Sequence, residues 1–165
     1  MSVAVALGRV VQKRRSPPAS LRRMDSVSVT DDVQRIDLDT VHRWLSTDAY
    51  WAIGRTRDKV ETASRGSLNF GALDETGALI GYARVVTDRA TFAWLCDVYV
   101  EPAARGRGVG SALVKTVLEA LEPMGLLRVM LATADAHEVY ERHGFRPVSE
   151  PEGLMRLKVA ASPGH

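Results

Sequence analysis

A glycine-rich segment spanning residues 105 to 111, Arg-Gly-Arg-Gly-Val-Gly-Ser, has the residue types needed to bind a phosphate group. Its three glycines alternate with other residues, so the backbone can approach a ligand closely and adopt unusual angles. An apolar run from 92 to 100 predicts a buried strand before it, and an amphipathic run from 109 to 121 predicts a helix after it. The first amides of such a helix lack internal partners and carry partial positive charge. Strand, glycine loop and helix therefore predict a site for a phosphate or pyrophosphate.

Three kinds of phosphate loop can be compared with this segment. A Walker loop needs Gly-x-x-x-x-Gly-Lys followed by Ser or Thr, and the chain has no such run. A dinucleotide fingerprint, Gly-x-Gly-x-x-Gly, can start at Gly106 but meets Ser111 where its third glycine should stand. The pattern Arg/Gln-x-x-Gly-x-Gly/Ala is matched without a gap by Arg105, Gly108 and Gly110. An exposed turn is the alternative interpretation of the loop taken alone.

A second motif lies between residues 136 and 147 and reads Ala-His-Glu-Val-Tyr-Glu-Arg-His-Gly-Phe-Arg-Pro, with Tyr140 on a predicted helix. The strand before the glycine loop ends Asp-Val-Tyr-Val-Glu-Pro at residues 97 to 102. With both motifs at this separation, the chain resembles the GCN5-related N-acetyltransferase (GNAT) superfamily. The resemblance covers about residues 27 to 158 and is strongest from 80 to 147, while residues 44 to 67 resemble small bacterial members.

The periodicity along the chain predicts alternating strands and helices. One helix is expected from a cap at Asp39 to Ser46, a second from a start at Thr56 or Asp58, and two more over 109–121 and 137–143, the last closed by Gly144. Strands are expected over 27–29, 68–73, 79–86, 91–100, 127–131, 145–148 and 154–159. This order predicts an α+β (mixed α/β) sheet. The resemblance implies the acyl-CoA N-acyltransferase fold, a mostly antiparallel sheet with one splayed parallel strand pair, flanked by helices.

Length and composition predict one folded domain with two appendages. The 165 residues suffice for a single core, which we place at 26–159, and residues 160–165 are expected to form a flexible tail. No apolar run approaches the ~20 residues that span a bilayer, so no membrane contact is expected. The lone Cys96 is expected to be a small buried hydrophobe and favours a reducing cytoplasm. Cysteines and histidines show no zinc spacing, so no metal is expected.

Positive charge is concentrated at the N-terminus. Residues 1–25 carry six Lys or Arg and one acid, whereas the remainder carries sixteen bases and nineteen acids. We interpret 1–25 as a disordered basic extension, with a transit peptide or a start at Met24 as alternatives. The mildly acidic remainder argues against nucleic-acid binding and suits an amine acceptor.

The resemblance implies acetyl-CoA as co-substrate, which a primary amine attacks directly in a ternary complex without a covalent enzyme intermediate. It places the oxyanion donor at the Val98 amide, pairs the pantetheine arm with residues 98 to 100, and brings the pyrophosphate to the amides of 106 to 111. Tyr140 would protonate the leaving thiolate, with a core tyrosine as the alternative. Thr133 stands where many members have an asparagine that touches the cofactor. The implied cofactor-binding residues are Val98, Tyr99, Val100, Arg105, Gly106, Arg107, Gly108, Val109, Gly110, Ser111, Thr133 and Tyr140.

The general base and the acceptor are less defined. Asp97, an acid within an apolar strand, is either the base or the partner of a buried arginine such as Arg84 or Arg128. Acceptor contacts are expected from Tyr50, Trp51 and His137; His137 has a capping role as its alternative. The small-molecule or peptide amine stays open among antibiotics, polyamines, amino acids and protein N-termini, and the chain is expected to be a monomer or homodimer. Two other classes stay open, a non-catalytic acyl-CoA-binding sensor or regulatory module and a nucleotide-binding domain.

Overall fold

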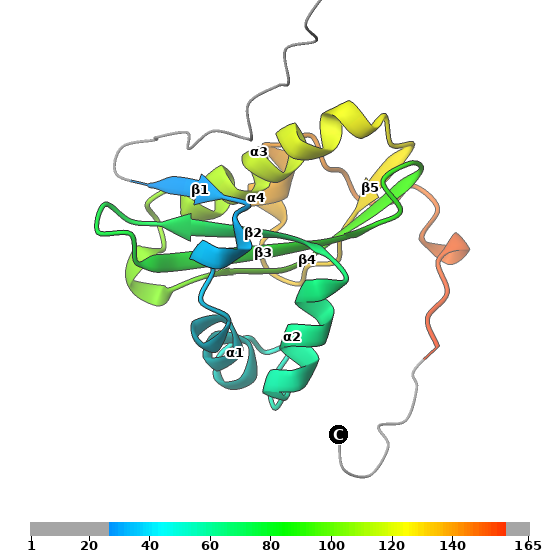
Figure 1. The fold of residues 1–165 in the computed structure, drawn as a ribbon. Coiled ribbons are helices and arrows are strands. Elements are labelled where there is room, and N and C mark those ends of the chain that lie inside the picture. The colour runs from blue at the N-terminus through cyan, green and yellow to red at the C-terminus, as the bar shows by residue number, and fades with distance from the viewer. Residues whose placement is uncertain (1–26, 158–165) are drawn as a thin grey trace, which may run out of the picture.

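A mixed sheet in the order β1-β2-β3-β4-β5 forms the centre of the computed structural model, which describes residues 27–157 (Figure 1). The first four strands are antiparallel to their neighbours, and β4 and β5 are parallel. The predicted α+β class with one parallel pair is therefore confirmed. The strands are β1 Ser28–Thr30, β2 Leu68–Leu73, β3 Leu79–Thr87, β4 Phe92–Val100 and β5 Arg128–Met130.

The parallel pair separates after a short contact. β5 pairs with β4 only from Phe92 to Trp94, and β4 then continues to Val100. Within the described chain, the edge of β4 from 95 to 100 therefore has no strand beside it on the β5 side. Backbone groups on such an edge can pair with an extended ligand.

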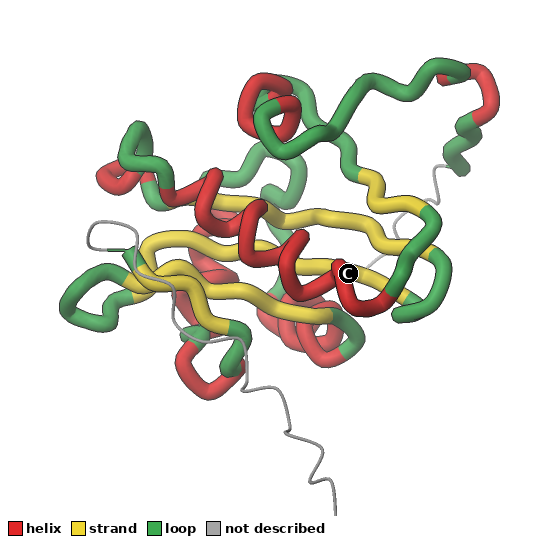
Figure 2. Tube along the Cα trace, turned by 90° about the horizontal axis from the view of Figure 1, so that it is seen from above, coloured by secondary structure: helices red, strands yellow, loops and turns green. Residues whose placement is uncertain are grey.

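Helices cover both faces of the sheet (Figures 1 and 2). α3 (Val109–Leu121) crosses one face, with α4 (His137–Glu141) beside it, and α1 (Leu38–Thr47) and α2 (Arg57–Arg65) lie on the other. α3 packs closely because Gly81 of β3 has no side chain: a Cβ there would lie 3.1 Å from Val109 Cγ1 and 3.2 Å from Leu113 Cδ1. On the opposite face, Trp44 of α1 is buried and its ring stacks 5.1 Å from that of Tyr99.

The helix starts follow capping chemistry. Thr56 caps α2 through a hydrogen bond from the Lys59 amide to its hydroxyl, as predicted. The predicted cap of α1 at Asp39 is wrong, because Asp37 takes that position and accepts from the amide of Asp39. Asp39 instead lies in the first turn of α1 and pairs with Arg57 of α2. Two acids two residues apart offer alternative caps, and the structure uses the first of them.

The two last predicted strands do not form within the described residues. Residues 145–148 are irregular, and Pro147 removes an amide that a ladder would need. Leu154, Met155 and Leu157 are exposed, so the segment has no buried face, and it extends away from the sheet (Figure 1). The predicted extension 1–25, the tail 160–165 and the last two residues of the predicted strand 154–159 lie outside the described residues. Among the helices of residues 27–157, none combines the length and apolar character that a bilayer crossing requires.

Candidate active site

A bulge in β4 lies beside the point where β4 and β5 separate. Tyr82 and Arg84 of β3 pair with Tyr99 and Cys96 of β4, so one β3 residue faces two β4 residues at Asp97 and the residue after it. Asp97 has a φ of 52°, in the left-handed region that Asp and Asn adopt more readily than most residues. A bulge of this kind changes the direction of the following backbone groups. The strand is therefore redirected where the predicted oxyanion donor begins.

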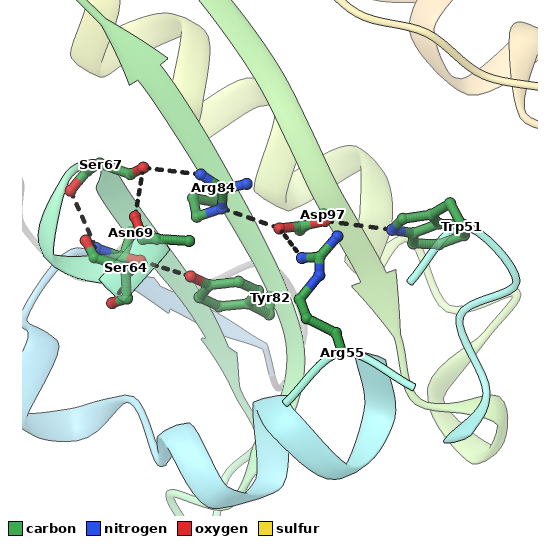
Figure 3. A network of polar contacts seen from close by, with 9 residues as sticks. Trp51, Arg55, Ser64, Ser67, Asn69, Tyr82, Arg84 and Asp97 are labelled. Atoms are coloured by element: carbon green, nitrogen blue, oxygen red, sulfur yellow. Dashed lines mark hydrogen bonds and ion pairs between the residues drawn. The ribbon is translucent and has the colours of Figure 1, made fainter. Parts of the chain in front are cut away.

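The Asp97 carboxylate is the centre of a buried polar network (Figure 3). Its side chain is 4% exposed, and Oδ2 accepts from Arg55 Nη1 at 2.7 Å and from Arg84 Nε at 2.9 Å. Oδ1 accepts from Trp51 Nε1 at 3.3 Å. Burial raises the pKa of Asp97, but the hydrogen bonds and charges of both arginines outweigh burial and leave this pKa below its ordinary value. The predicted pairing with Arg84 is confirmed, Arg128 is exposed on β5, and Arg55 is a partner that the sequence did not reveal.

The same network reaches the end of α2. Arg84 Nη1 donates to Ser67 Oγ at 3.0 Å, and the Ser67 carbonyl accepts from Asn69 Nδ2 at 3.1 Å. Asn69 Oδ1 in turn accepts from Ser64 Oγ at 3.0 Å and from the Tyr82 hydroxyl at 2.5 Å. Burial raises the pKa of Tyr82 and keeps it a neutral donor. The polar groups inside this face of the sheet thus satisfy one another and fix Arg84 in place.

A cavity of about 360 Å³ opens over the bulge. It brings together residues from three parts of the chain: the α1–α2 connection, the bulged strand, and the segment from β5 to α4. Six predicted site residues line it, namely Tyr50, Trp51, Asp97, Val98, Thr133 and Tyr140. The exposed Tyr50 and Trp51 rings meet edge to face with centroids 4.9 Å apart.

Tyr140 is half-buried at one wall of this cavity. Its ring contacts that of Phe145 at 5.9 Å, nearly perpendicular. Burial, followed by the nearby Asp135 and Tyr50, raises the pKa of Tyr140 to about 12. The phenol is therefore protonated at neutral pH and can donate its proton or a hydrogen bond.

Of two further predicted residues, His137 lies outside this cavity, and Thr133, which lines it, also has a structural contact. His137 does not line this cavity; it lines a neighbouring one of about 290 Å³, which also borders Tyr140 and Phe145. The α4 helix directs His137 to that side, so the structure does not bring it to Tyr50 and Trp51. The Thr133 hydroxyl accepts from the Ala136 amide at 3.1 Å and so holds the chain that leads into α4.

The glycine loop has the backbone geometry predicted for a phosphate site. Gly106 and Gly108 have φ values of 74° and 80°, and a Cβ on either would meet no atom within 4 Å. Both glycines are therefore required by backbone angle rather than by space. α3 begins directly after Gly108, which supplies no side-chain cap. The amides of residues 109 to 111 thus remain available, and the loop fits a pyrophosphate such as that of acetyl-CoA.

Arg105 and Ser111 contact protein groups at the two ends of this loop. Arg105 Nε donates to the Val100 carbonyl at 3.0 Å, and its guanidinium lies 5.5 Å from the centre of the Tyr99 ring. Asp48 accepts from both Arg105 and the Tyr99 hydroxyl. Ser111 Oγ lies 2.8 Å from Nε2 of His143, at the end of α4. These contacts anchor the loop to β4 on one side and to the Tyr140 helix on the other.

Comparisons with known proteins agree on one family. A model described as the acetyltransferase (GNAT) family matches residues 38–145. A solved structure from Xanthomonas campestris pv. campestris, described as belonging to the GNAT family, is 42% identical with a TM-score of 0.77, over 83% of this chain and 96% of that one. A Gibberella zeae protein named as an acetyltransferase is 29% identical over 82% of this chain and 88% of its own. Thialysine N-epsilon-acetyltransferase of Sus scrofa is 38% identical over 64 residues, which are 36% of this chain and 38% of that protein.

Proposed function

The chain belongs to the acetyltransferase (GNAT) family, and on that premise we propose that it transfers the acetyl group of acetyl-CoA to a primary amine by direct attack in a ternary complex. The observation that carries the proposal is the cavity where β4 and β5 separate, because Val98 and Tyr140 both line it. An oxyanion donor and a proton donor on one cavity stabilise the two charges that develop in thioester aminolysis, on the carbonyl oxygen and on the departing sulfur.

The chain's own groups have distinct tasks in this proposal. Acetyl-CoA supplies an acetyl group activated as a thioester. The amides at the start of α3 bind its pyrophosphate, and the free edge of β4 from 98 to 100 pairs with its extended arm. The Val98 amide donates a hydrogen bond to the thioester oxygen as negative charge develops there. Tyr140 donates a proton to the departing sulfur as the C–S bond breaks, which its raised pKa permits because the phenol is neutral before reaction. The amine attacks in its neutral form, and the proton that its nitrogen loses as the C–N bond forms returns to the Tyr140 phenolate.

Asp97 fits a positioning role better than that of a general base. Its lowered pKa makes it a weak proton acceptor, and both its oxygens already accept hydrogen bonds. We propose that Asp97 maintains the bulge and orients Arg55 and Trp51. We also propose a cytoplasmic location, because the single cysteine of the chain, Cys96, is a free thiol and fits a reducing compartment.

Thiol release from acetyl-CoA with a panel of amines tests the proposal, with Tyr140→Phe as the informative variant. Turnover should fall by roughly 10²–10⁴, the range for a positioned general acid, with little change in acetyl-CoA affinity. Tyr82→Phe is the matched control, because it removes a buried phenol outside the cavity and should leave turnover intact.

Three other results would count against parts of this proposal. Near-normal turnover of Tyr140→Phe with a loss of about 1 kcal/mol in stability would make Tyr140 a core residue. Binding of acetyl-CoA without turnover of any amine would favour the non-catalytic sensor. Failure to bind acetyl-CoA would reject both the acetyl transfer and the sensor.

A further inference from the structure

Two cavities share a pair of partly buried arginines in their lining. The cavity over the bulge continues past Arg55 and Arg84 toward α2, where a second cavity of about 620 Å³ begins. Arg55 and Arg84 are the only described residues that line both cavities. Their side chains are 23% and 14% exposed, so each can present N–H groups to a bound molecule.

The charge at this junction is not balanced by the protein. Between the two guanidinium groups lies one carboxylate, Asp97, which accepts from both. Cys96 also lines the first cavity, but burial raises the pKa of its thiol to about 11, so it adds no negative charge at neutral pH. Along α2, the exposed Asp58 and Lys59 offset each other at the rim. One positive charge is therefore left in excess at the junction.

Arg55 carries N–H donors that can bind an anion attracted by this excess positive charge. Among the described residues, its side chain bonds to a single acceptor, Oδ2 of Asp97, through Nη1. Arg84 is more fully engaged, because it also donates to Ser67. Figure 3 shows one Arg55 nitrogen bonded to Asp97 and no bond from the other guanidinium nitrogens to the residues drawn. Because Arg55 lines both cavities, these remaining donors are suited to a bidentate contact with an anion.

The wall of the first cavity that comes from the β5–α4 segment has the opposite polarity. This wall consists of Ala132, Thr133, Asp135, Ala136 and Tyr140, and none of these residues is Lys, Arg or His. Asp135 is close enough to Tyr140 to raise its pKa, so the cavity presents a carboxylate near the proposed proton donor and a guanidinium on the wall from the α1–α2 connection. An ammonium group is favoured at the first position and an anion at the second.

We propose that the acceptor carries an anionic group, a carboxylate or a phosphate, in addition to the amine that is acetylated. Arg55 binds the anion with support from Arg84, and the amine lies toward Asp135, Tyr140 and the Val98 amide. This assignment rests on the proposed acetyl transfer and deepens it. It disfavours acceptors that carry amines and no anion, such as polyamines.

Matched acceptor pairs test the assignment. L-lysine is compared with 1,5-diaminopentane, which lacks its carboxylate, and O-phosphoethanolamine with ethanolamine, which lacks its phosphate. The anionic member of one pair should show a kcat/KM at least about tenfold higher, because it makes a charge-assisted contact that its partner cannot. The pair with the larger ratio of kcat/KM between its two members shows whether the preferred anion is a carboxylate or a phosphate. Equal or faster turnover of both anion-free members would overturn the assignment while leaving the acetyl transfer intact.

Protein variants separate a binding role of Arg55 from a structural one. Arg55→Gln should erase the preference mainly through KM, and Arg55→Lys, which keeps the charge but loses the bidentate geometry, should retain only part of it. Arg65→Gln removes a charge from α2 outside both cavities and should leave the preference unchanged. If Arg55→Gln lowers kcat/KM equally for both members of a pair, the assignment is overturned.

Equilibrium binding keeps the assignment testable without turnover. If none of the four amines is acetylated, the proposed transfer fails for these acceptors, and calorimetry with the same molecules decides the anion question. Tighter binding of the anionic members that Arg55→Gln abolishes would support the assignment. Equal binding or none would overturn it.

Discussion

Replacing Asp97 by Asn removes one negative charge from the centre of the buried network and changes little else. The amide has nearly the shape of the carboxylate, and Asn tolerates the φ of 52° at this position at least as well as Asp. The bulge in β4 should therefore persist. What changes is that Arg55 and Arg84 lose the one carboxylate between them.

The expected cost follows from burial. Removing one partner of a buried ion pair costs about 3–5 kcal/mol, because the remaining charge loses its compensation. Arg55 and Arg84 keep 23% and 14% exposure, so water recovers part of this loss and the lower end applies. We expect a decrease of about 3 kcal/mol in the free energy of unfolding, or roughly 10 °C in Tm for a domain of this size.

Urea unfolding at several pH values measures this contribution. The folded pKa of Asp97 lies below its ordinary value, so protons bind the unfolded chain more readily. The stabilisation is then complete above the unfolded pKa of ~3.9 and is lost as the pH falls through the folded pKa. The difference between wild type and Asp97→Asn should be constant near neutral pH and should shrink in acid.

Two results would refute this reasoning. A decrease below about 1 kcal/mol would show that the two arginines are well solvated without Asp97. Loss of the acidic limb of the rate profile in the folded variant, together with a ~10²-fold lower kcat, would make Asp97 the general base.

Further predictions concern the loop, a core tyrosine and the link between α3 and α4. Gly108→Asp should weaken acetyl-CoA binding, measured by calorimetry, by at least about tenfold relative to Gly108→Asn. Both side chains tolerate the φ of 80°, and only Asp adds a negative charge beside the phosphates. Equal affinities of the two variants would place the phosphates elsewhere. Tyr82→Phe should lower stability by about 1 kcal/mol in urea titration through the lost hydrogen bond to Asn69, and an unchanged midpoint would contradict that bond. Ser111→Ala should reduce the protection of the amides in α4 from hydrogen exchange, because it releases His143; unaltered exchange rates would show that this contact is dispensable.

Local sequence signals located most of the fold. The alternation in residues 68–73 predicts β2 with its bounds, and the amphipathic run 109–121 predicts α3, because each pattern reports a face that packs on its neighbours. The last two predicted strands do not form among residues 27–157, because their alternation does not correspond to a face that packs on a neighbour. Leu154, Met155 and Leu157 meet no partner surface within the described chain. In 145–148, Phe145 packs on Tyr140 but Val148 is 46% exposed, so no continuous face forms there either.

The site was predictable where it depends on backbone and less so where it depends on contacts between distant segments. The glycines at 106 and 108 predict positive φ values, and both residues have positive φ in the structure. Arg55 stands 42 positions from Asp97, and nothing local to it signals that contact. The bulge itself has only a faint signal, an acid within an apolar strand. The sequence predicts His137 at the site because it begins the helix that carries Tyr140. The i, i+3 spacing does place both residues beside one cavity, but that cavity is the neighbouring one of about 290 Å³ rather than the one over the bulge.

The Arg55–Asp97–Arg84 contacts divide the acceptor region into a part that is fixed and a part that can vary. Any substitution among these three residues disturbs the core, so the charge that the region prefers changes only at a cost to folding. Tyr50 lines the cavity over the bulge, is 58% exposed and makes no bond to these three residues, so its replacement disturbs little else. Diverging descendants of this protein can therefore exchange the size and shape of their acceptors readily while keeping the acceptor's charge. Engineering of a new acceptor range should begin at Tyr50.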